Sequence, residues 1–171
     1  MTRRTIWWAI PLLAMAVSLF ALPALAQGQT TVTGAGAGAF PAGTTFKSSS
    51  LSALKGVTLT GLTFGMGVAL PGNSTANGNF ESTLIGTSAK GLPRNIVVEG
   101  NVTSGSSQAG GPANYAGICT VNPGDGTATL TGVPFTVNVA KLPNGAWGIT
   151  LTLSSTSLPV ATVTSGSVTV K

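Results

Sequence analysis

The sequence contains no histidine, a single cysteine and only three acidic residues among 171. Histidine and paired carboxylates carry most proton transfer in enzymes, and a catalytic thiol needs a neighbouring base such as an imidazole. With no second cysteine, Cys119 cannot form an intramolecular disulfide. This composition predicts a protein that is not an enzyme and that binds no cofactor.

Charged residues of either sign are scarce, at 6% of the chain, and the pI near 10.0 follows from the shortage of acids. The basic residues after position 26 are spread singly, whereas nucleic-acid binding requires clustered lysine and arginine. We therefore expect no nucleic-acid partner. Threonine, serine, asparagine and glycine supply the polar surface instead, and abundant threonine and valine favour β-strands.

Residues 1–26 have the three parts of a bacterial secretory signal: a basic start, an apolar centre and an Ala-x-Ala end at Ala26. The pattern predicts cleavage after Ala26. The Arg3–Arg4 pair also fits a loose twin-arginine pattern, so the general secretory and twin-arginine routes both remain open. The alternative is a retained membrane anchor, because the apolar stretch is near the ~20 residues needed to span a bilayer. We expect a secreted, periplasmic or extracellular protein with no stable membrane span after processing.

After the signal, residues 27–55 are rich in glycine and alanine and include the stretch GAGAGAF. Their apolar periodicity is weak. We expect a short strand near residues 31–33, followed by a flexible connection to about residue 55. The folded domain is then expected to span residues 56–171.

From residue 57 onward the apolar residues alternate with polar ones, which is the pattern of half-buried strands. The apolar parity switches at Gly61, and such a switch indicates a bulge because one extra residue reverses the faces that follow. A second clean run places Val133, Phe135, Val137 and Val139 on one face.

Turn-forming pairs separate these runs at Pro71-Gly72, Asn77-Gly78, Gly110-Gly111-Pro112, Pro123-Gly124 and Asn144-Gly145. Short strands at this spacing, with no helical pattern between them, predict an all-β fold. We expect an antiparallel β-sandwich (jelly-roll or Ig-like) or a flattened barrel of about 8–9 strands.

The stretch NYAGICTVNPGDGT, residues 114–127, holds the chain's only tyrosine, cysteine and aspartate. Alternation places Tyr115, Cys119 and Val121 on one face, where Cys119 would act as a small apolar core residue. A reactive or intermolecular thiol is the alternative interpretation.

The following NPGDGT reads as a turn, in which Pro123 sets φ and Gly124 supplies a positive φ. The alternative is a calcium site formed by Asn122, Asp125 and Thr127. Calcium usually takes six to eight oxygens, several of them from carboxylates, so a single aspartate makes this a weak metal candidate.

Glu81 and Glu99 form the other candidate site. If the segments around them pair as a hairpin, a register in which residue numbers sum to 180 places the two side chains opposite each other and outward. Two carboxylates ~5 Å apart is the spacing of a retaining glycosidase, and like charges at that spacing are unfavourable on a sheet. The alternative is an ordinary solvated surface, with Lys90 and Arg94 close enough to relieve the repulsion.

The sequence predicts a secreted non-enzymatic β-protein with a structural, cell-surface or adhesive role, whose partners would be polysaccharide or other cell-surface components. An extracellular carbohydrate- or ligand-binding module is the alternative, although Trp147 lies in phase with core residues. A small outer-membrane β-barrel is a minor alternative, and a glutamate-pair hydrolase is the enzymatic one. The oligomeric state is not predicted.

Overall fold

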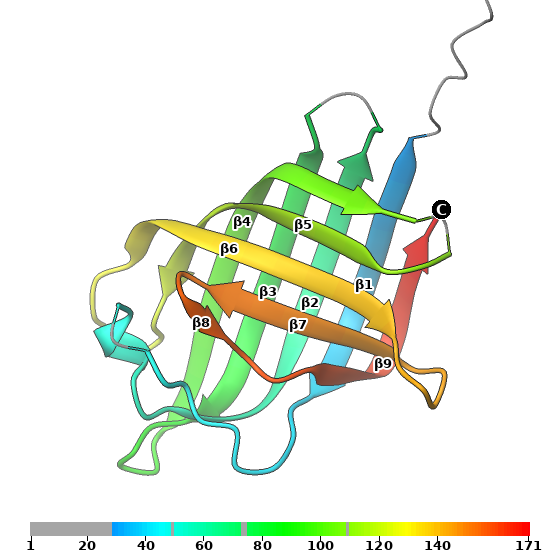
Figure 1. Ribbon diagram of the computed structural model, residues 1–171. Helices are drawn as coiled ribbons and strands as arrows, with labels where there is room; N and C mark the ends of the chain where they lie inside the picture. The colour runs from blue at the N-terminus through cyan, green and yellow to red at the C-terminus, as the bar shows by residue number, and fades with distance from the viewer. Residues whose placement is uncertain (1–28, 49, 73–74, 109) are drawn as a thin grey trace, which may run out of the picture.

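The structure is a computed structural model that describes residues 29–48, 50–72, 75–108 and 110–171. The expected signal peptide and its cleavage at Ala26 lie outside the described residues. Within these ranges the chain forms nine strands and one short 3₁₀ helix (Figure 1): β1 (Thr30–Ala39), η1 (Ser52–Leu54), β2 (Thr58–Leu70), β3 (Asn77–Thr87), β4 (Pro93–Ser107), β5 (Ala113–Asn122), β6 (Leu130–Lys141), β7 (Trp147–Leu153), β8 (Thr156–Ser157) and β9 (Ala161–Val170).

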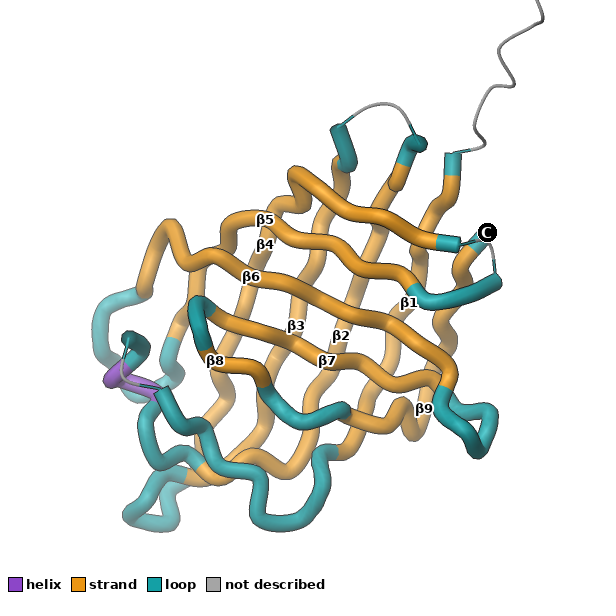
Figure 2. Tube along the Cα trace, in the orientation of Figure 1, coloured by secondary structure: helices purple, strands orange, loops and turns teal. Residues whose placement is uncertain are grey.

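All strand pairs are antiparallel, and the strands form one sheet in the order β6-β5-β4-β3-β2-β1-β9-β7-β8. An additional pairing of β6 with β7 closes this sheet into a flattened ring. In Figure 2, strands β5, β6 and β7 cross in front of β1, β2, β3 and β4. The prediction of an all-β, antiparallel fold is confirmed.

The ring is closed unequally on its two sides. Strands β4 and β5 pair along most of their length, whereas β7 meets β9 at only two residue pairs, Gly148 with Thr162 and Ile149 with Ala161. The preceding strand β8 also pairs with β7, and Pro159 lies between β8 and β9. Because proline has no N–H to donate, this connection interrupts what would otherwise be one long strand.

Strand β1 is longer than the sequence predicted. It spans ten residues rather than three, and it pairs with β2 on one side and with β9 on the other. Its glycines permit close contact with β9, because a side chain on Gly36 would collide with the carbonyl oxygen of Ser165. The expected boundary at residue 55 is therefore not a structural boundary, and β1 belongs to the same sheet as the rest of the domain.

Residues 40–48 and 50–57 are folded against one end of the ring rather than forming a free connection. Their large apolar side chains are buried in the common core: Phe40, Phe46, Leu51, Leu54 and Val57. An isolated bridge between Thr45 and Thr58 and the short helix η1 order this segment. No helix in the described part of the chain is long and apolar enough to cross a membrane.

The alternation expected from the sequence is present in the core. Val133, Phe135, Val137 and Val139 all face inward and are buried, and the predicted bulge appears as a register shift between Leu59 and Gly61. Three aromatic side chains meet inside the closed sheet: the ring centroid of Phe80 lies 6.1 Å from that of Tyr115 and 5.9 Å from that of Phe135. This filled interior holds the two layers together.

Two of the expected turns can be compared directly with the strands. Asn144-Gly145 forms the β6–β7 hairpin turn, with Gly145 at a φ of 83°. Asn77-Gly78 was wrongly predicted as a turn, because both residues lie at the start of β3 and pair with β2. Gly78 fits there because a side chain would collide with the backbone of Gly67, so this glycine serves close strand approach instead.

Candidate functional site

Tyr115 and Cys119 point into the core from β5, as the alternation predicted. The hydroxyl of Tyr115 donates a hydrogen bond to Sδ of Met66 at 3.4 Å. Burial raises the pKa of Tyr115 well above its usual value and raises the pKa of the Cys119 thiol to about 11. Both groups therefore stay protonated at neutral pH, the opposite of what an activated nucleophile requires.

The NPGDGT segment forms the predicted turn. The amide of Gly124 donates to Oδ1 of Asn122 at 3.0 Å, and Gly124 has a φ of 71°. The backbone N–H and the hydroxyl of Thr127 both donate to Oδ1 of Asp125, at 3.1 and 2.5 Å. These are local side-chain turns of the kind that asparagine and aspartate favour.

The other carboxylate oxygen of Asp125 lies 2.6 Å from Nη1 of Arg94, an ion pair that the sequence did not predict. The side chain of Arg94 is 10% exposed and that of Asp125 is 26% exposed. Arg94 also donates from Nη2 to the carbonyl of Ala53 at 3.1 Å. One guanidinium therefore ties the β5–β6 loop, the start of β4 and the η1 segment together.

The ion pair between Arg94 and Asp125 involves one of the three residues that were considered as calcium ligands. Oxygens of Asn122 and Asp125 accept hydrogen bonds within the turn, and the charge of Asp125 is neutralised by Arg94. Within the described residues there is no group of three or more His, Cys, Asp or Glu side chains that could hold a metal ion. The geometry of Asn122, Asp125 and Thr127 is that of a turn anchored to Arg94.

Glu81 and Glu99 lie directly opposite each other on β3 and β4, in the register that the sequence predicted. Both side chains are exposed. The cations that were expected to relieve the repulsion are placed elsewhere, because Arg94 is buried against Asp125 and Lys90 lies in the turn between the two strands. The only ion pair among the described residues is Arg94–Asp125.

The neighbouring outward positions extend this pair into a polar patch. Asn79 lies opposite Asn101 two residues along the same strands, and both are exposed. The strand beside Glu81 carries Gly65 in register with it, with open space where a side chain would be. Two shallow depressions on the outer face are each lined by both glutamates. Beside this bare backbone, the carboxylates can accept hydrogen bonds from the hydroxyl groups of a ligand, and the amides can both accept and donate them.

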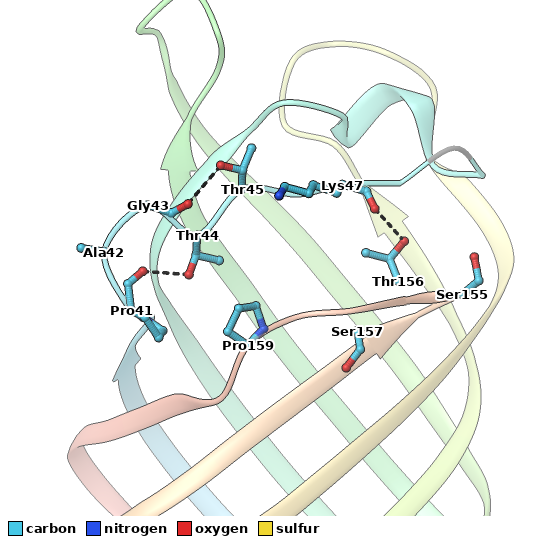
Figure 3. A pocket seen from close by; sticks show the side chains of 10 residues that line it. All are labelled: Pro41, Ala42, Gly43, Thr44, Thr45, Lys47, Ser155, Thr156, Ser157 and Pro159. Carbon is cyan, nitrogen blue, oxygen red and sulfur yellow. Dashed lines mark hydrogen bonds between the residues drawn. The ribbon is translucent and has the colours of Figure 1, made fainter.

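A cleft of about 510 Å³ lies where residues 41–47 approach residues 155–159 (Figure 3). Lys47 and several threonine and serine hydroxyls line it. Two of these hydroxyls hold the loop itself, since Thr44 donates to the carbonyl of Pro41 at 2.7 Å and Thr156 donates to that of Lys47 at 3.4 Å. Sequence reasoning missed this cleft because its two sides are far apart in the chain and neither carries a motif.

Trp147 is half-buried at the start of β7 and packs against the core. The ammonium of Lys141 lies 5.5 Å from the centroid of its ring, within the range of a cation–π contact. The indole is thus engaged within the protein.

Comparisons of the chain with protein-family models, with curated proteins and with solved structures found no match.

Proposed function

We propose that the chain, once its expected signal peptide is removed, is an exported non-enzymatic β-protein with a structural, cell-surface or adhesive role. The observation that carries this proposal is the placement of the reactive groups. Cys119 and Tyr115 are buried in protonated form, and Asp125 is paired with Arg94. A domain arranged in this way presents its outer surface to partners and uses its polar groups to hold the fold.

The outer surface of one layer supports a contact role. Outward positions on β9, β1 and β2 carry only small side chains: Ser165, Ser167 and Thr169; Thr33, Ala35 and Ala37; Thr63, Gly65 and Gly67. Small side chains lose little rotamer entropy when they are buried, whereas lysine or arginine loses up to ~2 kcal/mol each. A broad contact on this face would therefore carry a low entropic cost.

Two measurements on the same preparation test the proposal. Fractionation of bacteria expressing the full chain should recover a product beginning at Gln27 outside the cytoplasm, and the purified product should not turn over glycoside, ester or peptide substrates. Hydrolysis that disappears in Glu81→Gln and persists in Asp125→Asn would contradict the proposal and support the glutamate-pair hydrolase. An unprocessed chain retained in the cytoplasm would also contradict it.

A carbohydrate-binding module is the second candidate, and the polar patch of Asn79, Glu81, Glu99 and Asn101 favours it. Planar amide and carboxylate groups can each make two hydrogen bonds to neighbouring sugar hydroxyls. Thermal-shift measurements against a glycan panel would reveal binding, because a ligand raises the melting temperature with its concentration and affinity. Asn101→Ala should abolish such a shift, and Asn138→Ala, a change at another outward asparagine, should preserve it.

The same patch bears on the outer-membrane alternative. Strands that face lipid carry apolar outward side chains, whereas the outward positions of β3 and β4 include Asn79, Glu81, Glu99 and Asn101. This polar face supports an aqueous location for that part of the ring. Recovery of the processed chain in the membrane fraction after a high-salt wash would argue for the outer membrane.

A further inference from the structure

Strand β9 is paired fully on only one side. It pairs with β1 over residues 162–170, but with β7 only at Ala161 and Thr162. No strand pairs with the other side of residues 163–169 anywhere in the described part of the chain. Figure 1 shows β9 at the margin of the layer that also contains β1, β2, β3 and β4.

The hydrogen-bond pattern identifies which backbone groups face this open side. Thr31 and Lys171 exchange two backbone hydrogen bonds, of 2.7 and 3.0 Å, so Lys171 directs its N–H and C=O toward β1. Bonded and non-bonded pairs alternate in an antiparallel ladder. The backbone N–H and C=O of Ser167 therefore also point toward β1, whereas those of Gly166 and Val168 point away from it. The carbonyl of Val170 follows this pattern, since it accepts from Gly110 at 3.2 Å.

The open side has few of the features that protect natural sheet edges. Edge strands usually carry a lysine, a proline or another charge that prevents pairing with a second chain. Residues 161–170 contain neither a charged residue nor a proline, and Thr164, Ser165, Gly166 and Ser167 are exposed. A register shift opposite Ala37 and Gly38 disturbs the strand near Thr164, and from Ser165 onward the register with β1 is continuous, with Gly166 at a φ of 89°.

We propose that β9 pairs antiparallel with β9 of a second copy of this chain, around a two-fold axis at Ser167. In this register Gly166 of each copy faces Val168 of the other, and the open N–H and C=O groups of both residues become paired. Ser167 then lies directly opposite Ser167 of the second copy. The two copies together form one continuous sheet through β1 and β9 of each.

A second copy suits this edge because the pairing brings no like charges together. The nearest charged residue is Lys171, at the end of the strand. In the proposed register the two lysines lie at opposite ends, about 26 Å apart at ~3.3 Å per residue. That separation exceeds the screening length of about 8–10 Å at physiological salt. A stretch this short makes a small interface of the weak, transient class, so we expect a dissociation constant on the order of 100 μM.

Sedimentation of the processed chain, residues 27–171, over concentrations from about 10 μM to 1 mM tests the dimer around the expected dissociation constant. We expect the mean mass to rise toward that of a dimer. Ser167→Lys places two like charges face to face and should leave only monomer. Ala35→Lys is the matched control, because Ala35 is the exposed neighbour of Ser167 on β1 and the same charge there is one strand away from the edge. This control should dimerise as the original chain does.

Cysteine cross-linking tests the register. In a Cys119→Ala background, Ser167→Cys should form a disulfide-linked dimer on oxidation, because directly opposite residues of an antiparallel pair have Cα atoms about 4.5–5.5 Å apart. Ser165→Cys is also exposed but lies about 13 Å from its counterpart at ~3.3 Å per residue, and should not cross-link.

Three results would overturn the proposal. The first is a chain that stays monomeric at every concentration. Binding of a separate extended peptide by such a monomer would not rescue the proposal. The second is dimerisation that Ser167→Lys leaves unchanged, which would place the contact on another surface. The third is equal cross-linking of Ser165→Cys and Ser167→Cys. The proposal does not depend on the surface role proposed above, because all three results concern the assembly alone.

Discussion

The ring of Phe135 on β6 lies against the backbone of Gly100 on β4, so closely that a Cβ atom on Gly100 would be 2.5 Å from Cε1 of Phe135. Phe135 also stacks on Phe80, with an angle of 19° between the two rings. The glycine thus makes room for an aromatic ring that joins the β5–β6–β7 layer to the β1–β4 layer. The contact links the two layers at the centre of the core.

Gly100→Ala should destabilise the protein by about 1–3 kcal/mol, the usual cost of inserting a methyl group into a well-packed core. Urea unfolding followed by tryptophan fluorescence would measure this loss. Gly65→Ala is the matched control, because a side chain there meets open space. It should be neutral or stabilise by about 0.4–1 kcal/mol through the unfolded state. Equal effects of the two changes would show that Phe135 does not require the glycine.

Asp125→Asn should destabilise the fold by about 1–3 kcal/mol, because it leaves the nearly buried guanidinium of Arg94 without its charged partner. The measurement is again the free energy of unfolding in urea. Addition of calcium should leave the melting temperature unchanged in both the original chain and the variant. A rise with calcium that Asp125→Asn abolishes would instead support the calcium site at Asn122, Asp125 and Thr127.

Glu81→Gln should raise the free energy of unfolding, whereas Asp125→Asn should lower it, although both changes remove one negative charge. Removing one of two like charges that lie opposite each other on a sheet should stabilise by about 0.2–1 kcal/mol. The gain should shrink in high salt, which screens exposed charges. In the double variant with Glu99→Gln, the second change should add almost nothing, since the repulsion is already gone. Strictly additive effects would mean that the two carboxylates do not interact.

The register of Glu81 and Glu99 could be predicted because apolar parity fixes which face of each strand is buried. A slip by one residue would turn every core side chain outward, so few registers were compatible with the pattern. The same reasoning placed Tyr115 and Cys119 in the core. Period-two alternation contains this information locally, within each strand.

The length of β1 could not be predicted in the same way, because alternating glycine and alanine give almost no contrast in hydrophobicity. The contact between Arg94 and Asp125 depends on how two loops meet, and the cleft at Lys47 joins segments from opposite ends of the chain. The partial closure between β7 and β9 depends on the path of the ring. Alternation within a strand contains none of these long-range relationships.

Cys119 should make stability depend on pH in the alkaline range. Its usual pKa is 9.0 and burial raises it to about 11 in the folded protein. Above pH 9 the thiol ionises in the unfolded chain but remains protonated in the folded one, so ionisation favours unfolding. The contribution of Cys119 to the free energy of unfolding is fully present below pH 9. Between pH 9 and pH 11 it falls by at most about 1.4 kcal/mol per pH unit.

Urea unfolding of the original chain and of Cys119→Ala at a series of pH values would check this dependence. The difference in stability between the two proteins should be constant below pH 9 and should move in favour of Cys119→Ala between pH 9 and 11. Tyr115 is present in both proteins, so its own titration cancels in the comparison. A difference that stays constant up to pH 11 would mean that the thiol is accessible to water in the folded state.

Hydrogen exchange tests most directly whether β1 is an integral part of the closed ring, the relationship on which the fold and the open edge of β9 both depend. Amides of residues 32–38 that bond to β2 or β9 should be protected to the same degree as those in the centre of β3, because paired core strands open only with large free energies. Exchange should be followed on the processed chain by mass spectrometry. Exchange of residues 32–38 at the rate of an unstructured peptide, with β3 still protected, would contradict the account.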